Sequence, residues 1–214
     1  SVAGTSAGGL ISGQAKPAHP LMAPPLTARP CRHNPQPMAI LPIIETPDAR
    51  LRAISTPVEV FDDALRTLVA DMFETMYDAP GIGLAAIQVG VPQRILVIDL
   101  QDIDPEDPEE KRIIRNPRTF INPIFSDPSE DVTVYSEGCL SVPEQYADVA
   151  RPSEITVAWQ DEHGAAHSER MTGLMATCIQ HEQDHLEGIL FIDHLSKLKR
   201  DMVLKKLNKL RRIG

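Results

Sequence analysis

Apolar side chains recur three or four positions apart between Asp62 and Tyr77, which is the spacing of one face of a helix. Asp62 or Asp63 can cap the start of this helix, and Pro80-Gly81 ends it. We expect the apolar stripe to pack into the core of the protein. It consists of Leu65, Leu68, Val69, Met72 and Met76.

Short runs of β-branched and aliphatic residues predict strands later in the chain. They lie at 94–100, 119–125, 132–135, 155–159 and 166–171. The last two runs flank the turn-forming sequence Asp161-Glu162-His163-Gly164, so we expect them to form a hairpin. The glycine-punctuated segment 81–91 and the acidic, proline-bearing segment 101–117 are expected to be loops.

Two further helices are expected towards the end of the chain. The first covers 173–186 and is ended by Gly188. The second covers 194–210 and has an apolar side. That side is formed by Leu195, Leu198, Met202, Leu207 and Leu210. Three helices mixed with short strands predict an α+β fold.

Residues 1–37 differ in composition from the rest of the chain. They contain seven prolines, no acidic residue and many Ser, Ala and Gly residues. Such a segment buries too little apolar surface to offset its conformational entropy, so we expect it to be disordered or a non-native extension. A targeting peptide is a further alternative. We expect 38–214 to form the folded domain.

The composition restricts the class of protein. A chain of 214 residues with 42% hydrophobic residues suits one globular domain with a core. No apolar run approaches the roughly 18 residues of a membrane span, so no membrane partner is expected. The three cysteines, Cys31, Cys139 and Cys178, are odd in number and favour a reducing, cytoplasmic compartment. Residues 1–37 leave an organellar location open.

The charge of the chain is unevenly distributed. The net charge of −9 argues against general nucleic-acid binding. From His194 onward, however, eight basic residues accompany a single acid, Asp201. This pattern indicates that the tail alone contacts a polyanion. The alternative is a solvated basic face on a helix that docks through Leu195, Leu198 and Met202.

The segment His181-Glu182-Gln183-Asp184-His185 carries the strongest chemical signal in the sequence. Two histidines four positions apart lie on one face of a helix, so both imidazoles can reach the same ion. Glu182 follows the first ligand and can act as a base toward a metal-bound water. The motif therefore predicts hydrolysis by a metal-activated water.

The third metal ligand distinguishes between families of metal-dependent hydrolases. The metzincin pattern fails because Phe191 stands where a further histidine belongs. A thermolysin-like site needs a downstream carboxylate, and Asp193 has no accompanying pattern. Cys139 lies upstream in a setting suited to a thiolate ligand. A set of one cysteine and two histidines leaves a tetrahedral position open for water, as a catalytic site requires.

Three motifs in order make the chain similar to a known family. They are Gly81-Ile82-Gly83-Leu84-Ala85-Ala86-Ile87-Gln88, Glu137-Gly138-Cys139-Leu140-Ser141 and the segment from His181 to His185. The chain resembles bacterial peptide deformylases, whose motifs are G-x-G-L-A-A-x-Q, E-G-C-L-S and H-E-x-D-H. The similarity extends from Met38 to near the C-terminus. It implies that Met38 is the original start and that 38–214 form the catalytic domain.

This resemblance implies an activity in protein biosynthesis. Deformylases hydrolyse the N-formyl group from the N-terminal methionine of newly synthesised proteins and release formate. The reaction implies a metal-bound hydroxide, with Glu182 as general acid and base. The implied donors to the oxyanion are the side-chain amide of Gln88 and the backbone N–H of Leu140. The implied architecture has antiparallel sheets around a central metal-binding helix, with another helix in each half of the chain.

The resemblance also implies a peptide-binding surface. Its residues are Gly81, Ile82, Gly83, Gly138, Leu174 and Cys178. Glycines let the backbone approach an extended peptide, which can pair with the protein as an added strand. Thr177 stands where many relatives have isoleucine, and Tyr146 stands where some have arginine.

The expected metal is a single divalent ion held by Cys139, His181 and His185. This ligand set suits Fe(II), Zn(II), Ni(II) or Co(II), and the resemblance implies Fe(II). No other cofactor-binding site is expected. The resemblance further implies a monomer that contacts the ribosome near the exit tunnel through the basic C-terminal helix.

Two other functions compete with this interpretation. A zincin-type metallopeptidase shares H-E-x-x-H, but Phe191 breaks the metzincin pattern and Cys139 supplies the missing ligand. A catalytically silent, ribosome-associated binding module would be expected to lose at least one functional residue, whereas Glu182, Gln88 and the three ligands are intact.

Overall fold

A five-stranded antiparallel sheet forms one side of the domain in the computed structural model, which describes residues 38–106, 109 and 112–211. The strand order is β1-β2-β5-β8-β9. These strands are β1 (Gly83–Ala85), β2 (Ile95–Ile98), β5 (Arg118–Ser126), β8 (Glu154–Gln160) and β9 (Ala166–Thr172). All four residues of β2 are buried, as expected for a strand covered on both faces. The expected extension, residues 1–37, lies outside the described residues.

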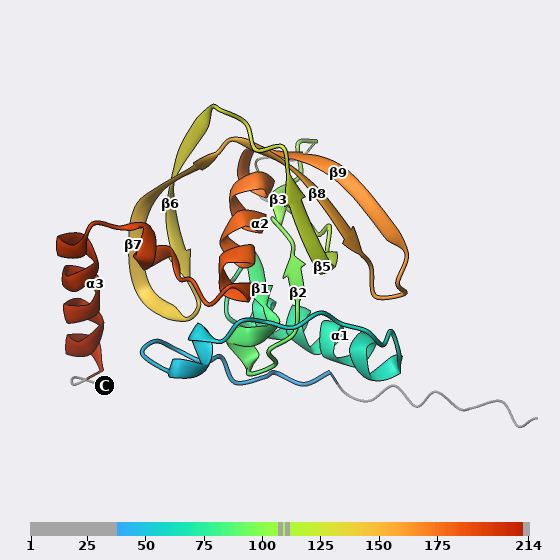
Figure 1. Cartoon of the computed structure of the whole chain (residues 1–214), viewed down its shortest axis with the longest axis horizontal. Helices are drawn as coiled ribbons and strands as arrows, with labels where there is room; N and C mark the ends of the chain where they lie inside the picture. Colours follow the sequence, from blue (N-terminus) through green and yellow to red (C-terminus); the bar gives the residue numbers. More distant parts are fainter. Residues whose placement is uncertain (1–37, 107–108, 110–111, 212–214) are drawn as a thin grey trace, which may run out of the picture. The chain divides into compact units, whose positions relative to one another are not determined.

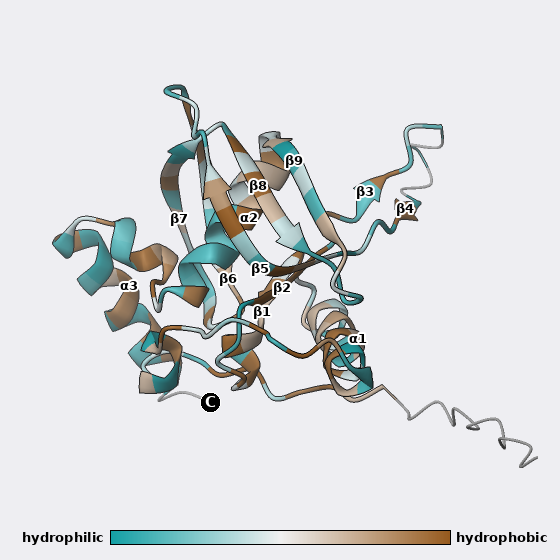
Figure 2. Cartoon of the chain, turned by 45° about the vertical axis from the view of Figure 1, so that its right-hand side comes forward, coloured by the Kyte–Doolittle hydropathy of each residue, from teal (hydrophilic) through white to brown (hydrophobic). Residues whose placement is uncertain are grey.

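Two smaller antiparallel sheets complete the β-structure of the described residues. A long hairpin joins β6 (Val132–Cys139) to β7 (Val142–Pro152). Its register shifts between Gly138 and Cys139, so that three residues of β7 bulge out of the ladder beside Cys139. A short hairpin joins β3 (Asp102–Ile103) to β4 (Ile113–Ile114) and stands away from the five-stranded sheet (Figure 2).

Three α-helices accompany the sheets in the described part of the chain: α1 (Asp63–Asp78), α2 (Gly173–Leu186) and α3 (Lys197–Leu210). Three short 3-10 helices are η1 (Ala49–Arg52), η2 (Ala86–Val89) and η3 (Phe191–His194). The Asp62 side chain caps α1 by accepting a 3.0 Å hydrogen bond from Leu65 N. None of these helices combines the length and apolar character needed to cross a bilayer.

Helix α2 lies at the centre, between the β6–β7 hairpin and the five-stranded sheet (Figure 1). Its apolar side packs into a core cluster with strands of the large sheet, through Ala176, Cys178, Ile179 and Leu186. Its histidines and Glu182 are buried as well. Burial around nearly the whole circumference explains why its polar side chains lie in an environment shielded from water.

The segment 44–55, here called the strap, connects the three motif-bearing parts of the chain. Its backbone hydrogen bonds run from Ile44 N to Gln88 O (2.7 Å), from Thr46 N to Ser141 O (2.8 Å) and from Ser55 N to Leu186 O (2.8 Å). Gln88 and Ser141 are the last residues of the first two motifs, and Leu186 directly follows the third. The strap thereby holds β1–η2, the β6–β7 turn and the end of α2 together.

A glycine makes the close approach of the strap to α2 possible. Gly188 has a φ of +70°, and a Cβ there would lie 2.5 Å from the carbonyl oxygen of Arg52. The Arg52 side chain donates a 3.1 Å hydrogen bond to the carbonyl of Gly188 and pairs with Asp193. A side chain at Gly188 would therefore displace the strap.

The structure confirms the main elements predicted from the sequence. The α+β class, α2, the central position of the metal-binding helix and the β8–β9 hairpin are as expected. The loop prediction for 81–91 was wrong, because that segment contains β1 and η2. The loop prediction for 101–117 missed β3 and β4, and no strand was predicted at β7.

The predicted apolar side of the C-terminal helix was also wrong in part. Leu207 is 2% exposed and packs in a core cluster with Val142, Val149 and residues of η3. In contrast, Leu198 is 73% exposed and Met202 is 54% exposed. Helix α3 therefore docks through its 203–207 side, and its 198–202 side faces outward.

Candidate metal centre and active site

The three predicted metal ligands meet at the junction of β6 and α2. Cys139 is the last residue of β6, and His181 and His185 are one turn apart on α2. Their ligand atoms all lie within 4.8 Å of one another, and Cys139 Sγ is 3.2 Å from His185 Nε2. Ligand atoms around a tetrahedral ion lie roughly 3.5 Å apart, so only a small closure separates this cluster from the spacing of such a ligand set.

Glu137 orients the first histidine of this cluster. Its Oε2 lies 2.8 Å from His181 Nδ1, which leaves Nε2 for an ion. Arg151 on β7 donates to both carboxylate oxygens of Glu137, at 2.6 and 2.9 Å. Burial raises the pKa of Glu137, but the hydrogen bonds from Arg151 and His181 outweigh it and lower the pKa to about 2. Glu137 is therefore a carboxylate that accepts from His181.

Arg151 also connects the ligand-orienting pair to the end of α2. Its Nη1 donates a 2.9 Å hydrogen bond to Asp184 Oδ2, which lies 2.7 Å from His194 Nε2. The Arg151 side chain is 5% exposed. This role of Arg151 is not evident from the sequence, because its partners lie on two other elements, Glu137 on β6 and Asp184 on α2.

The two histidines differ in their protonation preference. Burial lowers the pKa of His181, but its contacts with Cys139 and Glu137 more than offset burial and raise that pKa above its usual value. Burial and the neighbouring His181 charge lower the pKa of His185. A neutral imidazole at His185 is the form that binds a metal ion.

Glu182 is a buried carboxylate beside the ligand cluster. It is 4% exposed, and its Oε2 has no hydrogen-bond partner within the described part of the chain. Burial raises the pKa of Glu182 to about 7. Gly83 leaves room for this side chain, because a Cβ at that position would collide with Glu182 Oε1. A carboxyl group tuned in this way can take up and return a proton near neutral pH.

The side chain of Gln88 is held in one orientation. Its Oε1 accepts a 2.8 Å hydrogen bond from Ala85 N. Its Nε2 is thereby directed towards Ser141 Oγ, at 3.1 Å, and Cys139 Sγ, at 3.6 Å. The 3-10 helix η2 and the strap bond to Gln88 O fix its backbone. Gln88 therefore presents N–H donors next to the ligand cluster.

A cavity of about 550 Å³ opens at this cluster. The structure places eleven of the twelve predicted site residues around it: Gly81, Ile82, Gly83, Gln88, Gly138, Cys139, Leu140, Leu174, Cys178, His181 and Glu182. His185, the twelfth, is 1% exposed and does not line the cavity, but it belongs to the ligand cluster. Leu174 and Ile82 are 40% and 37% exposed, as expected of apolar groups that line an open cavity.

Strand β7 supplies a cavity wall that was not predicted from the sequence. Pro143, Glu144 and Gln145 line the cavity from the bulge of this strand. Tyr146 pairs with Gly138 across the hairpin, and a Cβ at Gly138 would collide with the tyrosine ring. Gly138 therefore lets an aromatic ring lie against the backbone beside Cys139.

Phe191 is close to the centre but offers no ligand. Its ring stacks on His181, with the ring centroids 6.1 Å apart and the planes inclined by 25°. The metzincin alternative places a histidine at this position. The structure instead gives the position an apolar, packing role.

Comparison with known proteins agrees with this geometry. The family model described as polypeptide deformylase matches residues 40–201. A peptide deformylase of Rhizorhabdus wittichii is 70% identical over 175 residues, covering 82% of this chain and 97% of the relative. The crystal structure of peptide deformylase from Ehrlichia chaffeensis has a TM-score of 0.75 and 41% identity, covering 82% and 98% of the two chains.

A second solved structure leads to the same family. The crystal structure of a peptide deformylase from Legionella pneumophila has a TM-score of 0.71 and 43% identity, and it covers 82% of this chain and 97% of its own. The family match spans the strap, all three motifs and the start of α3. The chain belongs to the polypeptide deformylase family, the metal-dependent hydrolases that remove N-formyl groups from nascent peptides.

Proposed function

We propose that Cys139, His181 and His185 hold one Fe(II) ion and that Glu182 moves the protons of the deformylation reaction. The observation that supports this most directly is the buried Oε2 of Glu182, which has no partner among the described residues and lies beside a cluster of one thiol and two imidazoles. The donor set fits Fe(II), Zn(II), Ni(II) and Co(II), and similarity to the deformylases favours Fe(II). Such an ion, when bound, would lower the pKa of a water molecule toward neutrality.

Glu182 has the properties needed for both proton transfers. Its raised pKa of about 7 allows it to accept a proton from water and to return that proton to the leaving amine. Gln88 Nε2 and the backbone N–H of Leu140 stabilise the charge that develops on the formyl oxygen, and each such donor contributes about 3 kcal/mol. Both residues line the cavity.

The peptide lies along the free edge of β1 in this proposal. Strand β1 is the last strand of its sheet and pairs only with β2 in the described structure, so its other edge can accept an added strand. Gly81, Gly83 and Gly138 allow close approach of the peptide backbone. Ile82, Leu174 and Cys178 receive the methionine side chain. In this proposal the protein acts as a cytoplasmic monomer whose catalytic domain is 38–214.

Metal-free protein, prepared anaerobically with a chelator and reloaded separately with Fe(II), Zn(II), Ni(II) or Co(II), tests the proposed activity. We expect formate release from formyl-Met-Ala-Ser to be fastest with Fe(II). Unformylated Met-Ala-Ser is the control, and it should remain intact with every ion. Cleavage of its peptide bonds would instead support the metallopeptidase alternative, and highest activity with Zn(II) would refute the iron assignment.

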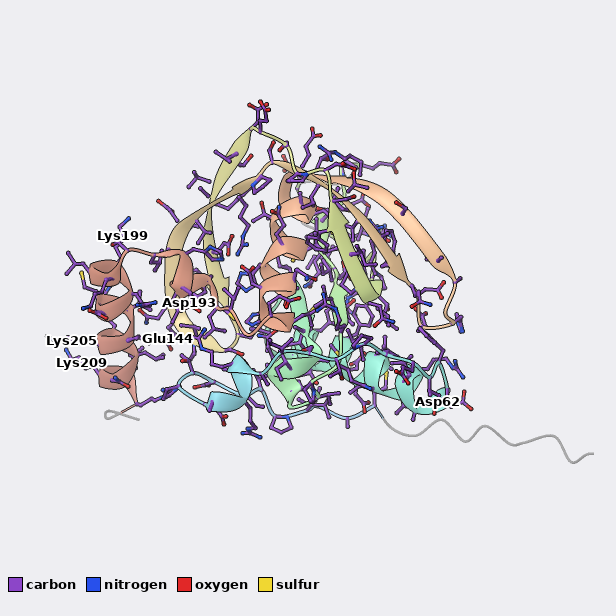
Figure 3. All side chains as sticks on the ribbon, viewed as in Figure 1. Asp62, Glu144, Asp193, Lys199, Lys205 and Lys209 are labelled. Carbon is purple, nitrogen blue, oxygen red and sulfur yellow. The ribbon has the colours of Figure 1, made fainter. Side chains whose placement is uncertain are left out.

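We further propose that the outward side of α3 contacts ribosomal RNA near the exit tunnel. Leu198, Met202, Lys205 and Lys209 recur at helical spacing, and all four are exposed. Figure 3 shows Lys205 and Lys209 on the side of α3 that faces away from β7. Lysines at this spacing can contact successive phosphates, while the opposite side of the helix stays docked through Leu207.

Charge reversal tests this surface better than truncation, because removal of Leu207 would uncover the core. The double variant Lys205→Glu/Lys209→Glu should lose cosedimentation with ribosomes and retain hydrolysis of short formyl peptides. The slope of binding against salt concentration should fall by about 2 on a double-logarithmic plot. The matched control is Arg50→Glu/Arg112→Glu, at two exposed sites outside α3. Equal cosedimentation of both variants would mean that α3 is only a solvated helix.

A further inference from the structure

Gln101 is anchored to the loop that leads into β1. Its side-chain Nε2 donates a 2.8 Å hydrogen bond to the carbonyl of Gly81. Gly81 N donates in turn to Met76 O at the end of α1, also at 2.8 Å. Both backbone polar groups of Gly81 therefore have partners within the protein, and the residue is a fixed point at the start of the glycine-containing loop.

The backbone of Gln101 adopts a conformation that needs support from its surroundings. Its φ is +55°, in the left-handed region that residues other than glycine rarely occupy. Asp99, which is fully buried, supplies this support by accepting 3.0 and 3.1 Å hydrogen bonds from Gln101 N and Asn116 N. The tyrosine hydroxyl of Tyr77 donates to the other carboxylate oxygen at 2.6 Å. These hydrogen bonds hold the turn in the conformation in which the Gln101 side-chain amide can donate to the Gly81 carbonyl.

The same turn holds the next residue of the loop. Asp99 N donates a 2.9 Å hydrogen bond to Ile82 O, directly before β1 begins at Gly83. Gln101 does not line the cavity, whereas Gly81, Ile82 and Gly83 do. Any effect of Gln101 on a bound peptide must therefore pass through the backbone of this loop.

We infer that Gln101 is a positioning residue that sets the peptide-binding edge of β1 for substrates extending beyond the formylmethionine. This inference rests on the proposed binding of the peptide along that edge. A loop with two glycines can sample many conformations, and a fixed Gly81 carbonyl removes that freedom before the peptide arrives. The chemistry at Glu182 and the ligand cluster does not depend on this hydrogen bond.

Two substitutions distinguish the effect of the Gln101 side-chain amide from the effect of its strained backbone. Gln101→Glu keeps the size of the side chain but has no N–H donor and places a negative charge against the Gly81 carbonyl. Gln101→Gly removes the amide and relieves the strained φ. In both variants we expect KM for formyl-Met-Ala-Ser to rise about fivefold, the effect of one lost hydrogen bond, with kcat and metal content unchanged. KM for formyl-Met amide should stay at the wild-type value.

The controls distinguish failure of this inference from failure of the binding mode. Gln93→Glu makes the same chemical change at a residue outside the cavity and should leave KM unchanged. Peptides N-methylated at the second or third residue should bind wild-type protein more weakly, and this difference should shrink in Gln101→Glu. If wild-type protein binds methylated and unmethylated peptides equally, the peptide does not pair with β1, and the inference fails with the proposed binding mode.

Two other outcomes would overturn the inference alone. In the first outcome, both Gln101 variants have the wild-type KM for formyl-Met-Ala-Ser and still bind methylated peptides more weakly. The peptide would then pair with β1, but Gln101 would have no part in positioning that edge. An equal rise in KM for formyl-Met amide and for the longer peptide would show general damage to the cavity rather than positioning of the extended edge.

Discussion

Glu182→Gln is expected to lower kcat for formyl-Met peptides by about a thousandfold while leaving the metal content unchanged. The amide has the size of the carboxylate but cannot accept the proton of water, and general acid–base catalysis contributes about 10²–10⁴ in rate. Glu182 is not among the three ligands, so metal binding has no reason to change. Formate release and metal analysis of the same purified sample measure both quantities.

The burial of Glu182 adds an expectation about stability. A buried carboxylate oxygen without a partner costs free energy, and a neutral amide at the same position costs less. The melting temperature of Glu182→Gln should therefore equal or exceed that of the wild type. Glu169→Gln, the same change on exposed β9, is the control and should keep full activity. A tenth of wild-type kcat in Glu182→Gln would exclude Glu182 as the base.

Cys139→Ser is expected to weaken metal binding by more than about a hundredfold. A serine hydroxyl stays protonated at neutral pH and is a poor ligand for a soft site, and even loss of an outer hydrogen bond to a ligand costs about 10–100-fold. Purified variant protein should contain little metal after gel filtration, and its formate release should fall in parallel.

Cys178→Ser is the matched control for this prediction. Cys178 is buried in the same cavity wall, but it is not part of the ligand cluster. This variant should retain its metal. Full metal occupancy in Cys139→Ser would refute the assignment of Cys139 as a ligand, and loss of metal from both variants would point to damage of α2 instead.

The sequence predicted best where the determining interactions are local. Both ends of α2 agree with the prediction, because its apolar spacing and the glycine after it lie within one short segment. The ligand cluster was found for the same reason: His181 and His185 are one helical turn apart. Cys139 is distant in sequence from the two histidines, so it was inferred from the chemistry of metal ligands. The oxyanion donors were inferred only from the resemblance to deformylases.

The missed elements depend on contacts that are distant in sequence. Strand β7 lacks a regular alternation, because its bulge follows Val142 and its buried positions include the charged Arg151. That arginine is buried only because Glu137 and Asp184 neutralise it. Strand β1 has three small or aliphatic residues and becomes a strand by pairing with β2.

The side of α3 that docks could not be read from periodicity. Two sets of apolar residues share this helix, one around Leu198 and Met202 and one around Leu204 and Leu207. Only the position of the η3 and β7 core decides which set is covered. In the structure Leu204 and Leu207 pack against this core. Leu198 and Met202 therefore face outward, together with Lys205 and Lys209.

The strap has a consequence for the order of events during synthesis. Translation produces residues 44–55 near the beginning of the domain, whereas Leu186, the partner of Ser55, is made near its end. A contact between such distant segments forms late and slows folding. Helix α2 carries His181 and His185. Until α2 has left the ribosome, Gln88 and Cys139 therefore have no histidines to pack against. A growing chain therefore lacks the assembled ligand cluster until at least the first 186 residues have been made.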